Sequence, residues 1–214
     1  DRLMIVYARD ILTQRPGTTF ISEVKASQCL YDDIAAKGGR PIMWKTGHSL
    51  MKAKLKAESA VLAGEMSGHM FFADRYFGFD DAIYASCRLV EILAKTKRSL
   101  SSLVADLPQT TVTPEIRVDC PDTLKFQLVD PVRTQLAAYL AEGQPVGASN
   151  LRMRELVTID GVRAMFEDGW GLIRASNTQP ALVLPFEAPS PARLDVMRAT
   201  IETELAQARR VLST

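Results

Sequence analysis

The sequence contains few cysteines, few histidines and no long apolar run, and its charges nearly cancel. Its three cysteines (Cys29, Cys87 and Cys120) are widely spaced and form no Cys-X-X-Cys pair, which predicts reduced cytosolic thiols. No apolar stretch approaches the length of a membrane-spanning helix. A formal net charge of +1 gives no reason to expect nucleic acid or a membrane surface as a partner. We therefore expect a cytoplasmic protein.

Length and apolar content indicate a globular protein. The apolar fraction of 47% is ordinary for a chain that buries a core, and 214 residues suffice for two modest domains or one large one. The sequence begins without a methionine at Asp1, where the periodicity of residues 1–14 already predicts a helix. We therefore expect the C-terminal part of a longer polypeptide whose N-terminal domains are missing.

Strands and helices alternate through the first half of the sequence. The expected strands cover residues 18–24, 41–44 and 60–63, and the expected helices cover residues 27–36, 49–56 and 80–95. This alternation indicates an α/β domain with a mixed, partly parallel sheet, in which ligands bind beyond the carboxyl ends of strands. Lys25, His48 and Glu65 each follow an expected strand directly, so we expect them at one edge of the sheet.

The helix expected over residues 80–95 has a clear apolar periodicity. Asp80 or Asp81 is expected to cap its N-terminus. The side chains expected on its buried face are Ile83, Cys87, Val90 and Ala94.

Beyond the proline- and threonine-rich segment 108–114, strands cluster together. Strands are expected over residues 115–120, 156–159, 162–166, 171–173 and 181–186, and helices over residues 124–140 and from residue 190 onward. The Asp-Gly pair at 160–161 predicts a hairpin turn. We expect an α/β mixed-sheet domain over residues 1–110, incomplete at its N-terminus, and a smaller α+β domain with an antiparallel sheet and flanking helices over residues 111–214.

The string Gly-Glu-Met-Ser-Gly-His at residues 64–69 presents a carboxylate (Glu65), a hydroxyl (Ser67) and an imidazole (His69) within five residues. Its glycines free the backbone to turn. Such a set suits a neutral polyol, because the carboxylate accepts from two vicinal hydroxyls while the other groups donate or accept. The alternative is a polar turn with a solvated glutamate.

A second string, Arg-Ala-Ser-Asn-Thr at residues 174–178, lies between two expected strands. It combines a guanidinium fork, two hydroxyls and an amide, which together form the donor set of a phosphate clamp. The alternative is a polar hairpin loop. The two strings together describe a sugar that one loop holds at its hydroxyls and the other holds at its phosphate.

Both strings, together with Trp-Lys-Thr-Gly-His at residues 44–48, resemble the α-D-phosphohexomutase superfamily, and especially its bacterial phosphomannomutase/phosphoglucomutase branch. The resemblance runs from the first residues to the last helix, with the motifs in the family's order. It implies an isomerase that interconverts hexose 1-phosphates and hexose 6-phosphates through a bisphosphate intermediate. Two alternatives stay open. One is a phosphoglucosamine mutase, which usually has glutamine in place of Met66, and the other is a non-catalytic phosphosugar-binding module.

The resemblance also implies roles for individual residues. Lys25, His48 and His69 are implied to be catalytic, with the lysine as a cation near the reacting group and a histidine as a proton shuttle. Glu65 and Ser67 are implied to contact adjacent sugar hydroxyls. The residues implied to hold the phosphate that is not transferred are Arg174, Ser176, Asn177 and Thr178.

Several features of the family are missing or altered. The phosphoserine loop and the Asp-X-Asp-X-Asp magnesium loop do not occur in this sequence. The resemblance therefore implies that Mg²⁺ and a glucose 1,6-bisphosphate-type activator serve the full-length parent, while this chain binds a phosphosugar without converting it. We expect no metal site in this chain, since no third ligand at a useful spacing accompanies His48 and His69. Pro185 replaces a residue that is usually basic in this branch, and it predicts an edge or a bulge.

Overall fold

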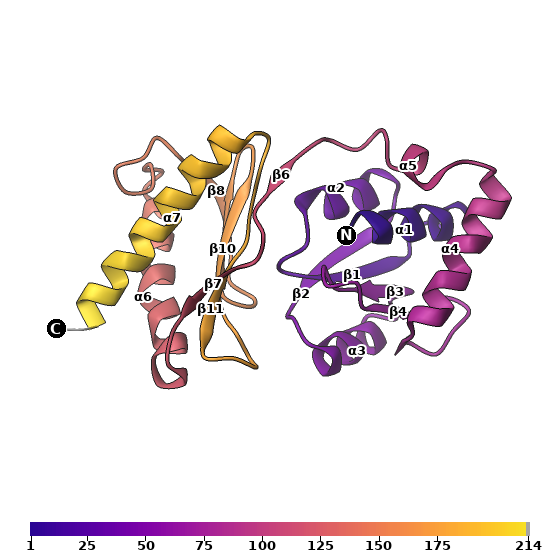
Figure 1. The fold of residues 1–214 in the computed structure, drawn as a ribbon, viewed down its shortest axis with the longest axis horizontal. Coiled ribbons are helices and arrows are strands. Elements are labelled where there is room, and N and C mark those ends of the chain that lie inside the picture. The colour runs from indigo at the N-terminus through magenta and orange to yellow at the C-terminus, as the bar shows by residue number, and fades with distance from the viewer. Residues whose placement is uncertain (213–214) are drawn as a thin grey trace. The chain divides into compact units, whose positions relative to one another are not determined.

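The computed structural model describes residues 1–212, which form two compact units (Figure 1). The first unit is Asp1–Pro108 and the second begins at Gln109. Each unit has its own sheet and its own apolar core. Among the described residues, no helix combines the length and the apolar character that crossing a bilayer requires.

The sheet of the first unit has five strands in the order β2-β1-β3-β4-β5. The strands are β1 (Thr19–Glu23), β2 (Arg40–Trp44), β3 (Leu62–Gly64), β4 (Met70–Phe72) and β5 (Phe79–Asp80). β1 pairs in parallel with β2 and β3, whereas β4 and β5 continue the sheet with antiparallel pairing. The expected mixed, partly parallel sheet is therefore confirmed, and its three parallel strands end at one edge.

Helices cover both faces of this sheet. They are α1 (Arg2–Gln14), α2 (Gln28–Ala36), α3 (His48–Ala57), α4 (Ala82–Thr96) and α5 (Leu100–Leu103). Successive side chains of a strand point to opposite faces. Phe20 accordingly packs in the core shared with α1, α2 and α4, whereas Ile21 packs under α3 with Met51 and Leu55. Asp1 is the N-cap of α1 and lies just outside the helix, where the sequence placed it inside.

The buried face of α4 differs from the expected one. Ile83 and Val90 are 81% and 64% exposed, so the predicted face is wrong. The buried residues of α4 are Ala85, Arg88 and Ile92. Arg88 tolerates burial because its guanidinium lies 3.0 Å from the Asp74 carboxylate and over the ring of Phe72. An ion pair inside the core rotates the helix away from the face that its apolar residues predict.

The second unit is an antiparallel sheet of seven strands with two long helices. The strands are β6 (Thr111–Val112), β7 (Ile116–Asp119), β8 (Met153–Val157), β9 (Val162–Phe166), β10 (Trp170–Ala175), β11 (Ala181–Leu184) and β12 (Phe186–Ala188). The long helices α6 (Asp122–Ala141) and α7 (Pro191–Leu212) lie side by side on one face of the sheet (Figure 1). The expected α+β architecture is confirmed.

β10 lies inside this sheet, paired with β9 on one side and with β11 and β12 on the other. Pro185 separates β11 from β12. The amide of Leu172 donates to the carbonyl of Pro185 at 3.1 Å, so the proline accepts a ladder hydrogen bond but has no N–H to donate. The predicted irregularity is present as a break in the strand, opposite β10 and away from the sheet edge.

Candidate functional site

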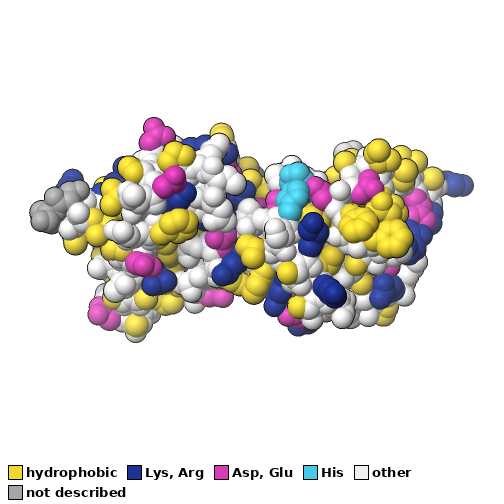
Figure 2. Space-filling model, turned by 90° about the horizontal axis from the view of Figure 1, so that it is seen from below, with side chains coloured by type: hydrophobic (Ala, Val, Ile, Leu, Met, Phe, Trp, Pro, Cys, Tyr) yellow, Lys and Arg dark blue, Asp and Glu magenta, His cyan; other side chains and the backbone are white. Residues whose placement is uncertain are grey.

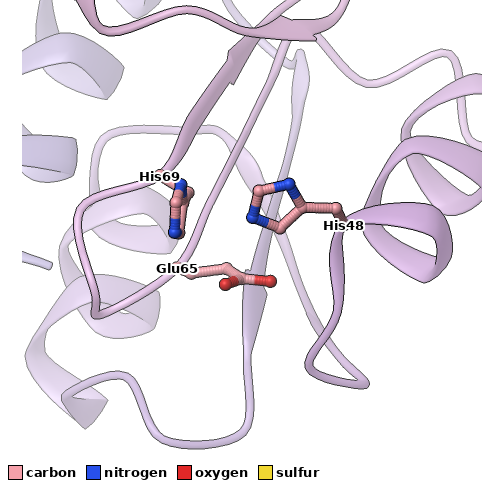
Figure 3. Close-up of side chains that lie close together, drawn as sticks. All are labelled: His48, Glu65 and His69. Atoms are coloured by element: carbon pink, nitrogen blue, oxygen red, sulfur yellow. The ribbon is translucent and has the colours of Figure 1, made fainter. Parts of the chain in front are cut away.

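Three side chains from two segments of the sequence meet in the first unit (Figure 3). His48 begins α3 after β2, Glu65 directly follows β3, and His69 directly precedes β4. Their potential ligand atoms all lie within 4.8 Å of one another. The structure thus brings His48 and Glu65 to one edge of the sheet as expected, and Figure 2 shows the histidine side chains at the surface. It also supplies Glu65 as a third potential metal ligand, which the sequence reasoning did not count.

Asp80 on β5 lies against both imidazole rings. Its Oδ2 atom is 2.7 Å from Nδ1 of His69 and 3.7 Å from Nδ1 of His48. The two rings meet edge to face, with centroids 4.3 Å apart. Of the two aspartates expected as caps of α4, Asp81 is the cap and accepts from the amide of Tyr84. Asp80 instead joins the histidine cluster, a role that sequence reasoning missed.

A backbone amide holds the Glu65 carboxylate in place. Glu65 is 7% exposed, and its Oε1 accepts the amide N–H of Gly47 at 3.0 Å. Gly47 adopts a φ of +132°, a backbone conformation that residues with a side chain rarely adopt. The Oγ atom of Ser67 lies 3.4 Å from Glu65 Oε2, so the hydroxyl predicted to act beside Glu65 is adjacent to it.

A buried carboxylate that the sequence analysis missed holds the surrounding loops together. Glu23 ends β1 and is fully buried. Its Oε2 accepts the amide of Lys25 at 2.8 Å and the hydroxyl of Thr46 at 3.1 Å, and its Oε1 accepts the amide of Met66 at 3.1 Å. The three loops that follow β1, β2 and β3 are therefore joined at one side chain. The backbone of Lys25, a predicted catalytic residue, is one of the groups that it fixes.

In the second unit, Arg174 lies near the end of β10 with its side chain 6% exposed. Its Nε donates to Asp160 Oδ2 at 2.7 Å. The neighbouring Gly161 has a φ of +87°, and a Cβ there would lie 2.4 Å from the carbonyl oxygen of Ile173. The Asp-Gly turn predicted from the sequence therefore packs against Arg174 and orients its guanidinium. Sequence reasoning missed this contact with Arg174, because a hairpin turn already explains why Asp160 and Gly161 are present.

The remaining predicted phosphate-binding residues follow Arg174 in one continuous loop. Ser176 is buried, and its Oγ accepts the amides of Thr178 at 3.3 Å and Gln179 at 3.2 Å. Asn177 and Thr178 are exposed. Lys125 of α6 donates to the carbonyl of Gln179 at 3.0 Å, which anchors the far end of the loop. Ser176 thus orders the loop, while its exposed neighbours present an amide and a hydroxyl.

The chain belongs to the phosphoglucomutase/phosphomannomutase family. Residues 1–111 match its alpha/beta/alpha domain III. Residues 115–204 match its C-terminal domain.

Individual relatives support this assignment. A phosphomannomutase/phosphoglucomutase of Pseudomonas putida is 46% identical over 205 residues, which cover 96% of this chain and 42% of that protein. The crystal structure of a family protein from Burkholderia thailandensis matches with a TM-score of 0.83 and 41% identity, over 97% of this chain and 41% of that one. An N-acetylphosphoglucosamine mutase of Aspergillus fumigatus, in complex with glucose 1,6-bisphosphate, shares the fold with a TM-score of 0.60 and 15% identity, over 99% of this chain and 42% of that one. The chain thus spans about two fifths of these relatives' length.

Proposed function

We propose that this chain supplies the sugar-binding and phosphate-binding parts of a phosphomannomutase/phosphoglucomutase, an isomerase that interconverts hexose 1-phosphates and hexose 6-phosphates. The observation that carries the proposal is the cluster of His48, Glu65 and His69, whose polar atoms lie within 4.8 Å of one another in a chain of this family. One carboxylate and two imidazoles at an exposed sheet edge can bind the hydroxyls of a sugar.

Glu65 is the residue proposed to bind the sugar hydroxyls. Its Oε1 is positioned by the Gly47 amide, and Ser67 adds a hydroxyl beside its Oε2. An ionised carboxylate accepts from two adjacent hydroxyls. A pair of equatorial hydroxyls near the middle of the ring presents a similar pattern after the sugar reverses its orientation. One carboxylate therefore serves both the 1-phosphate and the 6-phosphate.

Lys25, His48 and His69 are the proposed catalytic residues, placed near the reacting end of the sugar. The Asp80 carboxylate at 2.7 Å favours a proton on Nδ1 of His69, which leaves Nε2 as the acceptor for a proton from a sugar hydroxyl. Lys25 contributes a cation that favours the negative charge of a phosphoryl group. Its backbone is fixed through Glu23.

Arg174, Ser176, Asn177 and Thr178 form the proposed clamp for the phosphate that is not transferred. The Arg174 guanidinium is oriented by Asp160 at 2.7 Å, which reduces the entropy lost when it binds an anion. Binding a remote phosphate supplies free energy that orients the reacting end of the substrate. The loop therefore contributes to the rate as well as to affinity.

The described residues do not fit Mg²⁺, because this ion takes oxygen ligands in octahedral geometry and two of the three clustered ligands are imidazoles. We propose that Mg²⁺ and glucose 1,6-bisphosphate act in the whole enzyme. The complex of the Aspergillus fumigatus relative supports the second assignment. Three cysteines without disulfides agree with a cytoplasmic location.

The test is a calorimetric titration of the chain with glucose 1-phosphate and, separately, with inorganic phosphate. We expect Glu65→Gln to lower the affinity for glucose 1-phosphate by about tenfold, the loss of one charge-assisted hydrogen bond, and to leave inorganic phosphate binding unchanged. Glu155→Gln, an exposed position of β8, is the matched control. If Glu65→Gln and Glu155→Gln bind glucose 1-phosphate equally well, the proposed sugar site is wrong. Turnover of glucose 1-phosphate by the chain alone would show that it does more than bind.

A further inference from the structure

We propose that His48, Glu65 and His69 form a binding site for a divalent transition-metal ion of the zinc class. The three ligand atoms come from the start of α3 and from the two ends of the 65–69 loop, and they lie within 4.8 Å of one another. Two imidazoles and one carboxylate are a ligand set that binds zinc in proteins, with a fourth position left for water. Figure 3 shows the Glu65 carboxylate beside both imidazole rings.

The surroundings of the histidines provide a second observation that points to a metal. A histidine that binds a metal usually donates its other ring N–H to a carboxylate, which fixes the tautomer and the ring orientation. Asp80 Oδ2 is 2.7 Å from Nδ1 of His69 and 3.7 Å from Nδ1 of His48. The shorter distance is a hydrogen bond, so a proton on Nδ1 of His69 leaves its Nε2 lone pair for the ion, whereas the contact with His48 is electrostatic only.

The third ligand, Glu65, is also held in place by a hydrogen bond. Glu65 is 7% exposed, and the amide of Gly47 donates to its Oε1 at 3.0 Å. Glu23 holds the loops on both sides of the site, accepting from the hydroxyl of Thr46 and from the amide of Met66. A preorganised carboxylate loses little conformational freedom when it binds an ion.

Small side-chain rotations suffice to close the site. Zinc bonds to nitrogen and oxygen of about 2.0–2.2 Å place tetrahedral ligands about 3.3 Å apart. The present limit of 4.8 Å therefore has to shorten by about 1.5 Å. The side chains of His48 and His69 are 44% and 45% exposed, which leaves both rings solvent-facing space in which to turn.

The ligand types decide which ion binds. Imidazole nitrogen favours zinc, cobalt and nickel, whereas magnesium and calcium favour oxygen. Zinc binding at these residues is therefore separate from the magnesium binding proposed for the whole enzyme. If the proposed function holds, the same side chains also bind the sugar, so zinc and a hexose phosphate exclude each other. Only this consequence rests on the proposed function.

The experiment is a zinc titration of the whole chain by calorimetry, together with NMR of the histidine ring signals. Cys29 and Cys87 are replaced by serine in every sample, because both reach solvent and thiolates bind zinc. The chain has only two histidines, so His48→Ala and His69→Ala assign both sets of ring signals. Magnesium serves as the comparison ion, and Glu155→Gln is the control for an exposed carboxylate.

We expect one zinc ion per chain, with the ring signals of both histidines shifted at stoichiometric zinc and unchanged by magnesium. Loss of an outer-shell partner lowers metal affinity by about tenfold to a hundredfold, which is the range expected for Asp80→Ala. Loss of a direct ligand in His69→Ala or Glu65→Gln should exceed about a hundredfold. Glu155→Gln should bind zinc as the parent does.

Two results would overturn the proposal. One is zinc affinity unchanged in His69→Ala and Glu65→Gln, and the other is unshifted histidine signals at saturating zinc. Glucose 1-phosphate is then added to the zinc-loaded chain. Zinc binding that resists displacement by a bound hexose phosphate contradicts the proposed sugar site and leaves the metal site standing. Hexose phosphate binding by a chain that binds no zinc contradicts the metal site and leaves the proposed sugar site standing.

Discussion

Among the described residues each unit buries two glutamates, and one from each unit, Glu23 and Glu204, have opposite surroundings. Glu23 of the first unit is fully buried and accepts hydrogen bonds from three groups of three different residues. Glu204 of α7 in the second unit is 3% exposed, and neither of its oxygens has a hydrogen-bond partner among the described residues. Burial alone therefore does not mark a functional carboxylate. The donors that converge on Glu23 come from the loops that form the candidate site.

The two units also build their candidate loops differently. In the first unit, the polar groups come from segments separated by many residues and meet at the ends of the parallel strands. In the second unit, the polar groups lie in one continuous segment, residues 174–178, supported by Asp160 and Lys125. Damage to the support of the first site should therefore spread through several loops. Damage to the second should remain local.

The largest effect is expected from Glu23→Ala. The substitution removes the acceptor of the Lys25 and Met66 amides and of the Thr46 hydroxyl, and a hydrogen bond to a charged group contributes about 1.5–3 kcal/mol. We expect the free energy of unfolding of the first unit to fall by about 3 kcal/mol or more. Hydrogen exchange measured by NMR should show faster exchange at both amides, while the amide of Gln179 in the second unit keeps its protection.

Glu155→Ala is the control for Glu23→Ala, since an exposed substitution should change stability by no more than about 0.5 kcal/mol. If Glu23→Ala leaves exchange at Lys25 and Met66 unchanged, the carboxylate does not hold the loops.

A smaller effect, on binding, is expected from Arg174→Lys. Lysine keeps the charge but loses the planar fork that grips phosphate with two hydrogen bonds. Charge-assisted hydrogen bonds are worth about 1.5–3 kcal/mol, so the affinity for inorganic phosphate should fall by about tenfold to a hundredfold. Calorimetry measures the change, with Arg154→Lys on the exposed face of β8 as the control. Equal phosphate affinity in the two variants would show that residues 174–178 are only a polar hairpin loop.

Glu204→Met should stabilise the second unit, in contrast to Glu23→Ala in the first. Apolar side chains, Val146 and Val196 among them, line much of the pocket around Glu204, and methionine removes a carboxylate that has no partner there. We expect a gain of about 1–2 kcal/mol in the free energy of unfolding, measured by urea denaturation. Gln207→Met, an exposed position of the same helix, is the control and should change little. A loss of stability in Glu204→Met would mean that the carboxylate has a partner in solution.

The smallest effect is a pH dependence. Burial raises the pKa of Glu204 above its ordinary value of 4.5. The folded state then binds the proton more tightly than the unfolded state, so Glu204 lowers stability as the pH rises from about 4.5 through its raised pKa. The stability advantage of Glu204→Met over the parent should therefore be small at pH 4 and larger at pH 7. An advantage that does not change with pH would contradict the raised pKa.

Local patterns in the sequence predict much of the fold. Ser27 caps α2 as expected, and the Asp-Gly pair at 160–161 lies in the turn between β8 and β9. The place of His48 and Glu65 follows from strand order alone, because parallel strands end at the same edge. That Arg174 lies beside residues 176–178 can be predicted because they form one short segment of the sequence.

The residues that sequence reasoning missed all have partners in a different element or loop of the fold. Glu23 lies within an expected strand, and only the folded structure shows that it accepts a hydrogen bond from Met66. The sequence explains Asp80 as a possible helix cap and Asp160 as a turn residue. In each case a local explanation sufficed, so nothing in the sequence indicated the long-range contact. The reversed face of α4 has the same origin, since it depends on the pairing of Arg88 with Asp74.

Recognition of the sugar by the first unit is proposed to depend on His48, Glu65 and His69. Its most direct test is NMR of the two histidine ring signals during titration with glucose 1-phosphate, with inorganic phosphate in a parallel titration. We expect saturable shifts of both signals with glucose 1-phosphate and none with inorganic phosphate. Signals that stay in place with glucose 1-phosphate, or that shift equally with inorganic phosphate, would contradict it.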